Sequence, residues 1–195
     1  MDYAKEVFEG IISGDEVFCG AGAQWIISNP EHMIMLNEYA NKCESVTEFG
    51  VFDWNTTWAF INSNINKLRC YDGKIRGRFD RPNGGYQDLQ DTCQAKGIDF
   101  KFMMEDTRKC DFEETDMLFI DTWHTYDQVR QELQHSSKVR KYIAFHDVVL
   151  YGKVGSGDEE GLLKGIYEFL FENYLEWEID TYCKKGNGLL VIKRC

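Results

Sequence analysis

Residues 116–126 read DMLFIDTWHTY, and this segment carries the clearest structural signal in the chain. Four uncharged residues, Met117 to Ile120, stand between two aspartates, and no helical period is visible. A short apolar run of this kind predicts a strand that is buried on both faces, as in a parallel sheet. In open α/β sheets, ligands bind beyond the carboxyl ends of the strands. We therefore expect a ligand-binding edge at the residues that follow the strand: Asp121, Trp123, His124 and Tyr126.

The segments on either side of this strand alternate between strand and helix patterns. Strands are expected at residues 45–51, 68–72, 99–104, 116–121, 141–146, 176–183 and 188–193, and helices at residues 2–13, 31–42, 56–67, 84–97, 127–139 and 159–173. Five strand–helix repeats predict a parallel sheet with helices on both faces, and the closing hairpin adds an antiparallel last strand. The predicted fold class is α/β, with a doubly wound, mostly parallel seven-stranded sheet.

The chain shows no internal repeat and no low-complexity segment. Its 195 residues are enough to bury a sizeable core, so residues 1–195 are expected to form a single domain. Within it, residues 1–43 are expected to form N-terminal helices and a lid, and residues 44–195 the core of the fold. Two glycine-rich segments, 20–23 and 152–157, are candidate lids over a bound molecule.

The chain is acidic, with a formal net charge of −11. Because an acidic surface repels a phosphate backbone, we expect no nucleic-acid partner. The one basic run, KIRGRFDR at residues 74–81, is short and interrupted by Asp80, which favours a solvated loop. No apolar run is long enough to span a bilayer, and MDYAKEVFEG at the amino terminus has no apolar signal segment. These features predict a cytoplasmic protein without a membrane partner.

The seven cysteines favour neither a disulfide framework nor a cysteine metal site. Their number is odd, their spacings are irregular, and no C-x-x-C pair occurs. Several fall in apolar segments, where a free cysteine behaves as a small hydrophobic residue. This usage is typical of a reducing compartment and supports the cytoplasmic prediction.

Acids stand at the end of each of the five expected parallel strands: Glu48, Asp72, Asp106, Asp121 and Asp147. Any one of them can be explained as a helix cap or a solvated loop residue. Together they predict a ligand that presents hydroxyls, amines or positive charge along the strand ends. A carboxylate after the second strand can accept both hydroxyls of a ribose, as it does for dinucleotide and S-adenosyl cofactors.

Three motifs resemble those of class I S-adenosylmethionine-dependent methyltransferases. VTEFGVFDWNTTWAFI at residues 46–61 is similar to their first motif, in which an acid-x-Gly strand end leads into a helix. DTWHTYDQVRQEL at residues 121–133 and FHDV at residues 145–148 resemble the small-molecule and sugar O-methyltransferase branch, which includes cephalosporin hydroxylase-like proteins and methyltransferase family 24. The order acid, tryptophan, basic residue also resembles catechol O-methyltransferases. The resemblance spans residues 31–194 and implies a Rossmann-like class I methyltransferase fold that binds S-adenosylmethionine.

The resemblance also implies a role for individual residues toward that cofactor. Gly50 would let the backbone approach the methionine part, and Glu48 would hold the loop from beneath. The other implied contacts are Phe52 and Thr56 at the methionine moiety, Asp72 at the ribose, Glu105 and Asp106 at the adenine amino group, Trp123 on the adenine face, and Asp121 near the sulfonium. Trp123 can also be explained as a core tryptophan.

The first motif departs from the family in one place. Asp53-Trp54-Asn55 stands where related enzymes carry further glycines, so the methionine pocket is expected to be narrower. This departure supports an alternative function, a non-catalytic or auxiliary protein of the same fold with altered or lost cofactor binding. A nicotinamide-dependent oxidoreductase is disfavoured, because no G-x-G-x-x-G turn follows the first strand.

Two histidines are candidates for the catalytic base that methyl transfer requires. His124 is the first choice, since the pKa of histidine lies near neutral pH and its position matches a basic residue of related enzymes. It can also be explained as a residue that caps a turn at the start of a helix. His146, at the next strand end, is the second choice.

A metal ion is a further implication of the resemblance. Asp121, His146 and Asp147 match the ligands of metal-dependent O-methyltransferases, in which magnesium aligns two substrate hydroxyls. Histidine at position 146 weakens the match to magnesium and permits a softer divalent metal. The expected reaction is transfer of a methyl group to an oxygen of a small hydroxylated acceptor such as a sugar or nucleotide sugar. Tyr126, Tyr151 and Trp25 are candidate walls of the acceptor pocket. The sequence is also compatible with a homo-oligomer.

Overall fold

The structure, a computed structural model, describes residues 2–13, 30–52, 54–74 and 83–195. The expectations for segment 20–23, for Trp25 and for most of the basic run fall outside these ranges. The described helices are α1 (Tyr3–Ser13), α3 (Pro30–Ala40), α4 (Asn55–Ile61), α5 (Tyr86–Lys96), α6 (Tyr126–Glu132) and α7 (Leu162–Glu172), with 3-10 helices η2 (Leu133–Lys138) and η3 (Ser156–Asp158). The strands are β1 (Ser45–Phe49), β2 (Lys67–Asp72), β3 (Asp99–Met104), β4 (Thr115–Ile120), β5 (Val139–His146), β6 (Trp177–Cys183) and β7 (Leu189–Arg194).

The strands form a seven-stranded sheet in the order β3-β2-β1-β4-β5-β7-β6. Strands β1 to β5 are parallel to one another, whereas β7 runs antiparallel to both β5 and β6. The chain moves outward from β1 to β3 and then returns to place β4 on the other side of β1. This reversal leaves a crevice beyond the carboxyl ends of β1 and β4, the place where ligands bind in open α/β sheets. The predicted doubly wound fold is confirmed.

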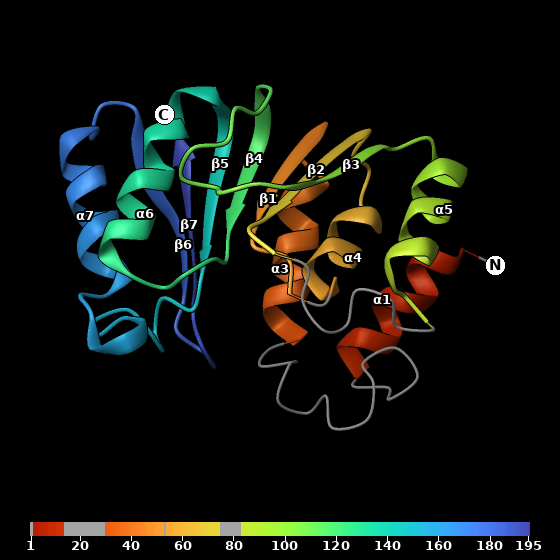
Figure 1. The fold of residues 1–195 in the computed structure, drawn as a ribbon, viewed down its shortest axis with the longest axis horizontal. Helices are drawn as coiled ribbons and strands as arrows, with labels where there is room; N and C mark the ends of the chain where they lie inside the picture. The colour runs from red at the N-terminus through yellow and green to blue at the C-terminus, as the bar shows by residue number, and fades with distance from the viewer. Residues whose placement is uncertain (1, 14–29, 53, 75–82) are drawn as a thin grey trace.

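Helices cover both faces of the sheet (Figure 1). Helices α1, α3, α4 and α5 contribute to one buried apolar cluster, and α6, η2 and α7 contribute to a second. Side chains of β4 alternate between these clusters: Met117 and Phe119 join the first, and Leu118 and Ile120 join the second. All six residues of β4 are buried, which explains why this strand has an uninterrupted apolar run.

Three local predictions differ from the structure. The helix after β1 ends at Ile61 rather than residue 67, because the Ser63 hydroxyl and backbone N–H both bond the Phe60 carbonyl and close its last turn. The helix predicted over residues 127–139 is α-helical only to Glu132, and η2 continues it as a 3-10 helix. Residues 105–114, between β3 and β4, contain no helix, so the strand–helix alternation is broken there.

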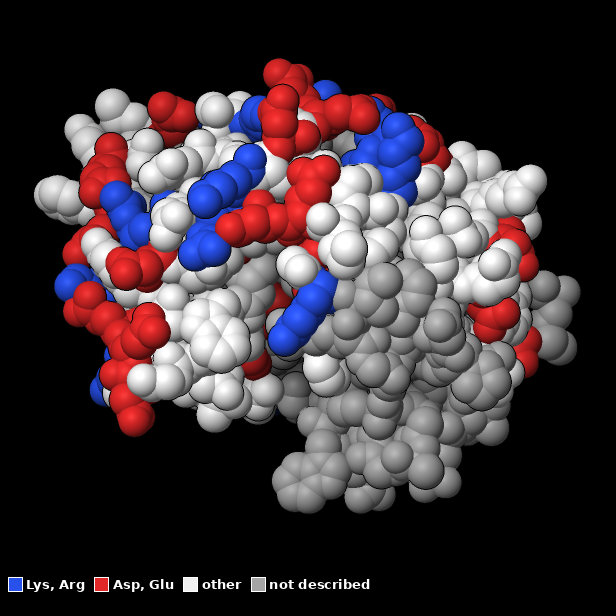
Figure 2. All heavy atoms as spheres, in the orientation of Figure 1, with Lys and Arg blue, Asp and Glu red and all other residues white. Residues whose placement is uncertain are grey.

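Helices α1 and α3, from the expected N-terminal region, share the first apolar cluster with α4 and β1. In the part of the chain that the structure describes, no helix combines the length and apolar character that crossing a membrane requires. The six described cysteines are free thiols, four of them buried. On the face drawn in Figure 2, acidic and basic side chains are interspersed over the described surface.

Candidate active site at the carboxyl edge of the sheet

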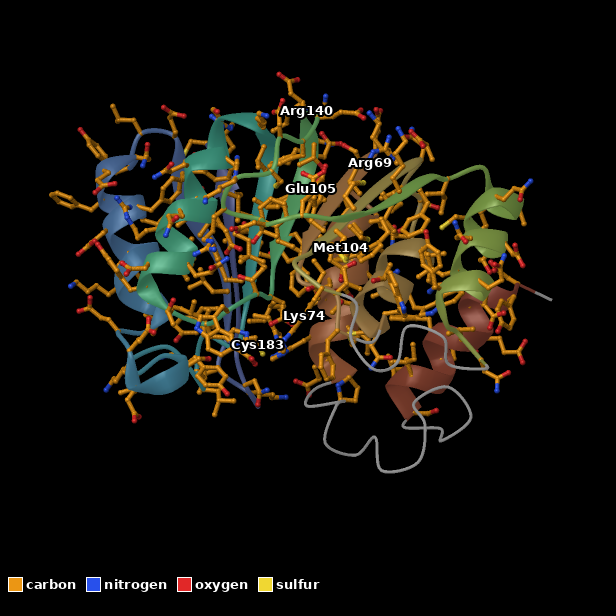
Figure 3. All side chains as sticks on the ribbon, viewed as in Figure 1. Arg69, Lys74, Met104, Glu105, Arg140 and Cys183 are labelled. Carbon is orange, nitrogen blue, oxygen red and sulfur yellow. The ribbon has the colours of Figure 1, made fainter. Side chains whose placement is uncertain are left out.

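A cavity of about 640 Å³ opens at the carboxyl ends of the parallel strands. Its walls contain all but two of the predicted site residues: Gly50, Phe52, Asp72, Glu105, Asp106, Asp121, Trp123, His124, His146 and Asp147. The exceptions are Glu48 and Thr56. Lys74 and Met104 also line the cavity, and Figure 3 shows them with Glu105 between the two groups of helices. The structure therefore brings together residues from five different strand ends.

Gly50 lies where the tips of β1 and β4 meet. Its N–H donates to the carbonyl of Tyr71 at 2.8 Å, and the N–H of Asp121 donates to the carbonyl of Phe49 at 2.8 Å. Gly50 has a φ of +87°, and a Cβ added there would lie 2.0 Å from the carbonyl oxygen of Asp121. Both the backbone conformation and the close approach require glycine. The residue fixes the spacing of the two strand ends that form the cavity floor.

Glu48 lies beneath this turn and is fully buried. Its carboxylate accepts hydrogen bonds from the Thr56 hydroxyl, from the Thr57 hydroxyl at 2.7 Å and from the Cys70 thiol at 3.2 Å. Burial raises the pKa of Glu48 to about 7, although these three donors act in the opposite direction. Glu48 thus ties the first turn of α4 to β1, and Thr56 contacts Glu48 instead of lining the cavity.

Trp54 does not fill the cavity, contrary to the expectation from the first motif. It is only 2% exposed and packs against the rings of Tyr86 and Phe102, with centroids 5.5 and 5.3 Å away. Its φ of +69° turns the chain into α4, in a left-handed conformation that favours glycine. The side chain is therefore accommodated in the core between α5 and β3.

The far end of the cavity is formed by the tips of β2 and β3. Asp72 accepts hydrogen bonds from the N–H groups of Val51 at 2.9 Å and Lys74 at 3.1 Å, which fix its carboxylate at the cavity wall. Arg108 contacts both carboxylate oxygens of Asp106, at 2.9 and 2.7 Å, and this pairing lowers the pKa of Asp106 to about 2. Both carboxylates are thus held in place before any ligand arrives.

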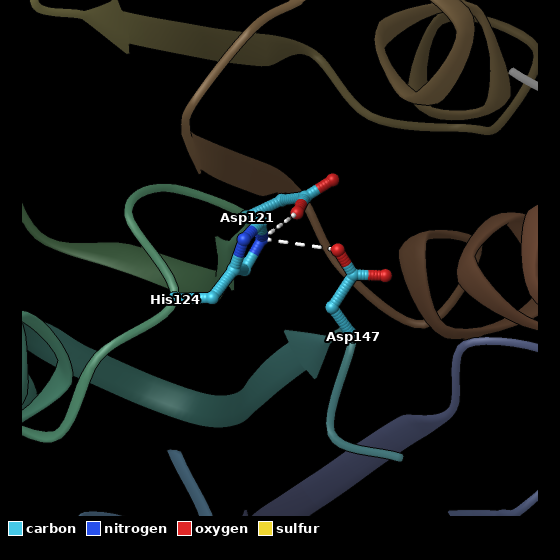
Figure 4. Close-up of side chains that lie close together, drawn as sticks. All are labelled: Asp121, His124 and Asp147. Carbon is cyan, nitrogen blue, oxygen red and sulfur yellow. Dashed lines mark hydrogen bonds and ion pairs between the residues drawn. The ribbon is translucent and has the colours of Figure 1, made fainter. Parts of the chain in front are cut away.

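The near end of the cavity holds a cluster of two histidines and two aspartates. His124 Nε2 lies 3.0 Å from Asp121 Oδ1 and 3.1 Å from Asp147 Oδ2 (Figure 4). On the other side of the carboxylates, His146 Nδ1 lies 3.4 Å from Asp121 Oδ2 and 3.2 Å from Asp147 Oδ1. Each aspartate therefore faces both histidines.

The electrostatics of this cluster follow from its burial and its charges. Burial and the neighbouring Asp121 raise the pKa of Asp147. Burial also works against the charged form of Asp121, but the facing His146 and His124 outweigh it and lower the pKa of Asp121. Asp121 raises the pKa of His146 although burial acts in the opposite direction. The pKa values of these two carboxylates and of His146 therefore depend on one another.

Two atoms in the cluster fit a metal ion. His146 Nδ1 and Asp147 Oδ1 are buried and lie 3.2 Å apart as an ion pair, without a well-aligned hydrogen bond among the described residues. Asp121, His124 and Asp147 each offer a ligand atom, and these atoms lie within 4.8 Å of one another. Imidazole nitrogens and carboxylate oxygens together form a donor set for a divalent cation.

His32, on α3, contacts this cluster from behind. Its Nδ1 lies 3.1 Å from His146 Nε2, and it is 1% exposed. Burial and His146 lower the pKa of His32 to about 4, although the backbone of Lys185 acts in the opposite direction. His32 therefore stays neutral at physiological pH.

Solved structures that are similar to this chain include methyltransferases. An O-methyltransferase from Bacillus cereus in complex with SAH matches with a TM-score of 0.61 at 13% identity, over 100% of this chain and 91% of that chain. SAH-bound methyltransferase PaMTH1 from Podospora anserina gives 0.60 at 12% identity, over 100% and 88%. The N-methyltransferase NodS from Bradyrhizobium japonicum gives 0.55 at 13% identity, over 84% and 93%. The chain has the class I methyltransferase fold. No family model and no curated protein matches its sequence.

Several side chains occupy positions in this methyltransferase fold that sequence alone left open. Trp123 is 56% exposed at the cavity wall, so the core interpretation is excluded. Tyr126 donates to Glu168 on α7 at 2.7 Å and lines neither described cavity. Tyr151 stacks on His124, with ring centroids 4.6 Å apart and planes within 1°.

Sequence reasoning missed two residues of the candidate site, His32 and Glu132. Glu132 is fully buried and accepts hydrogen bonds from three residues of the cavity wall: Thr107, Thr122 and Gln128. Burial raises its pKa to about 7. One sequence signal could have identified Glu132: it lies beside the apolar Val129 and Leu133 on an amphipathic helix. An acid on the buried face of a helix needs hydrogen-bond partners.

Proposed function

We propose that the protein is an S-adenosylmethionine-dependent methyltransferase. The observation that carries the proposal is the cavity at the switch point of a methyltransferase fold, with Asp72 fixed at one end and Asp121 at the other. Asp72 accepts the ribose hydroxyls, and the exposed ring of Trp123 covers the adenine. Phe52 lines the methionine part, while Asp121 favours the nearby sulfonium charge. The bound cofactor supplies a methyl group on a positively charged sulfur.

The remaining predicted residues support this cavity in different ways. Glu105 and Asp106 lie at the adenine end, where Arg108 already holds Asp106. Glu48 and Thr56 act on the methionine end from beneath, through the first turn of α4. Gly50 keeps the two central strand ends close enough to form the floor.

We propose that the acceptor is a small hydroxylated molecule, methylated on oxygen. A second cavity, of about 630 Å³, shares Trp123 and His124 with the first and adds Tyr151, Ser156 and Asp158. An acceptor bound there reaches the methyl group beside His124. Its Ser156 and Asp158 side chains suit hydroxyl groups, as on a sugar or nucleotide sugar. The loop that carries segment 152–157 forms part of this cavity.

His124 is the proposed catalytic base. It lies between the two cavities, and the stacked ring of Tyr151 fixes its plane. In the proposed transfer, the bond from the acceptor oxygen to the methyl carbon would form as the carbon–sulfur bond breaks and S-adenosylhomocysteine leaves, and the imidazole of His124 would take up the hydroxyl proton. The carboxylates of Asp121 and Asp147 would stabilise the resulting imidazolium. His146 is farther from the second cavity and serves better as a metal ligand.

We propose that Asp121, His146 and Asp147 hold a divalent metal ion. This assignment is supported by the position of His146 Nδ1, which lies 3.4 Å from Asp121 Oδ2 and 3.2 Å from Asp147 Oδ1, so that the three donor groups face one another. When bound, such an ion orients the acceptor oxygens and lowers the pKa of a coordinated hydroxyl.

Calorimetric titration with S-adenosylhomocysteine (SAH) tests the function, with and without added magnesium or zinc. We expect a Kd in the micromolar range for the wild type and a loss of at least about tenfold for Asp72→Asn. Absence of binding in every condition would exclude a cofactor-dependent methyltransferase.

The alternative function is a non-catalytic protein of this fold. The sequence feature that supported this alternative was the bulk of Trp54 in the first turn. Trp54 lies in the core rather than in the cavity, so it gives the alternative no support. His124→Ala separates the two functions once an acceptor is found by screening nucleotide sugars. A catalytic role predicts that methyl transfer falls by about 10²–10⁴-fold while SAH affinity stays the same.

A further inference from the structure

His32 connects the N-terminal helix α3 to the cluster at the tip of β5. Its Nδ1 approaches Nε2 of His146 to 3.1 Å, although 114 residues separate them in the chain. The two rings meet edge to face, with centroids 5.2 Å apart and planes at 85°. The His32 side chain is only 1% exposed, so this contact is shielded from bulk solvent. The orientation of His146 therefore depends on a helix outside the sheet.

The contact links the protonation of both rings. Of two imidazole nitrogens at hydrogen-bond distance, one must donate and the other accept. On its other side, Nδ1 of His146 faces carboxylate oxygens of Asp121 at 3.4 Å and Asp147 at 3.2 Å. For that nitrogen to present its lone pair to a cation, the proton of a neutral His146 must sit on Nε2. Nε2 then donates to His32.

We propose that His32 is a positioning residue, which accepts the hydrogen bond from His146 Nε2 and holds His146 Nδ1 toward Asp121 and Asp147 as the ligand of a first-row transition metal. This inference rests on the metal site proposed above and names both the residue that orients it and the class of ion. An imidazole nitrogen beside two carboxylates suits zinc or iron(II), whereas magnesium prefers oxygen donors throughout. Partners behind a metal-bound histidine fix its tautomer and ring orientation.

Three variants of the full chain separate orientation from general packing. His32→Leu fills the same space but cannot accept the hydrogen bond. His32→Asn carries a side-chain oxygen close to the place of Nδ1 and keeps an acceptor. Met33→Ala removes a buried side chain from the next position of α3, and Met33 does not line the cavity. Urea unfolding of each variant measures how much packing is lost.

Zinc affinity, measured by competition with a chelator of known affinity, is the first readout. We expect His32→Leu to lower it about 10- to 100-fold. His32→Asn should restore most of the affinity, and Met33→Ala should bind zinc like the wild type despite its lower stability. Unchanged affinity in His32→Leu, or an equal loss in His32→Leu and Met33→Ala, would overturn the inference.

The proton on His146 is the second readout, and it does not depend on activity. The chain has four histidines, so ¹⁵N-histidine NMR of the zinc-loaded protein can resolve each ring. We expect His146 to carry its proton on Nε2, with zinc on Nδ1. A proton on Nδ1 of His146 would contradict the proposed orientation.

SAH titration of the same samples measures the proposed function separately. If the wild type binds SAH but no zinc, the inference about His32 fails while the methyltransferase proposal stands. If it binds zinc with the expected His32 dependence but no SAH, the metal site stands and the methyltransferase proposal fails.

Discussion

At Gly50 the absence of a side chain sets the geometry of the whole cavity floor. A Cβ there would lie 2.0 Å from one backbone atom of Asp121 and 2.6 Å from another, and backbone cannot move aside as a side-chain end can. The φ of +87° adds strain for any other residue. Gly97, at the end of α5, provides a matched comparison, since its φ is +70° and nothing lies within 4 Å of its Cβ position.

We therefore predict that Gly50→Ala lowers the free energy of unfolding by about 3 kcal/mol or more and abolishes SAH binding. Gly97→Ala introduces backbone strain without a steric clash, so it should lower the free energy of unfolding by about 1–2 kcal/mol and leave the SAH affinity unchanged. Urea unfolding and calorimetry measure both effects. Equal losses in the two variants would mean that the contact with Asp121 is unimportant.

At the scale of elements, β4 carries an aspartate at each end, and the two have different tasks. Asp121, at the carboxyl end, faces the histidine cluster. Asp116, at the amino end, is buried and accepts hydrogen bonds from the Glu44 N–H at 2.7 Å, Arg140 at 2.8 Å and Lys141 at 3.1 Å. These partners belong to the entrance of β1 and to β5, so Asp116 ties three strands together.

Removing the hydrogen bonds of Asp116 should destabilise the sheet without altering the cavity. We predict that Asp116→Ala lowers the free energy of unfolding by about 1–2 kcal/mol, because it removes three hydrogen bonds while the half-exposed Arg140 and Lys141 can turn to water. The Kd for SAH should stay within about twofold of wild type, whereas Asp121→Asn should weaken binding with little loss of stability. An Asp116 variant that is folded but does not bind SAH would show that the two ends of β4 are not independent.

The elements also show which features the sequence could predict. The strand at 116–121 was predictable because both of its faces are buried and its apolar run is uninterrupted. The helix end at Ile61 and the 3-10 turn at Leu133 were not, because local hydrogen bonds decide them without changing the apolar pattern. The acids at the carboxyl ends of the strands could be predicted, because each one directly follows a recognisable strand. The contact of His32 with His146 could not, because it depends on how α3 packs against the sheet and no local sequence spacing reveals it.

For the whole molecule, buried acids determine how stability depends on pH. Burial raises the pKa of both Glu48 and Glu132 from 4.5 to about 7. The folded state then binds more protons than the unfolded state between about pH 4.5 and 7, so each residue makes the free energy of unfolding fall as pH rises through that window. His32 acts in the opposite direction, since its pKa is lowered from 6.5 to about 4 and the unfolded state binds its proton more readily.

Replacing one glutamate isolates its contribution from that of His32. We predict that Glu132→Gln reduces the loss of stability between pH 5 and pH 7.5 by about 2–3 kcal/mol, because glutamine resembles the protonated acid and cannot ionise. Glu48→Gln should behave in the same way, while Glu176→Gln, which replaces an exposed carboxylate, should follow the wild-type curve. Urea unfolding at the two pH values measures the difference. A Glu132→Gln protein with the full wild-type pH dependence would mean that Glu132 is ionised at neutral pH in the folded state, and that its three hydrogen-bond donors outweigh its burial.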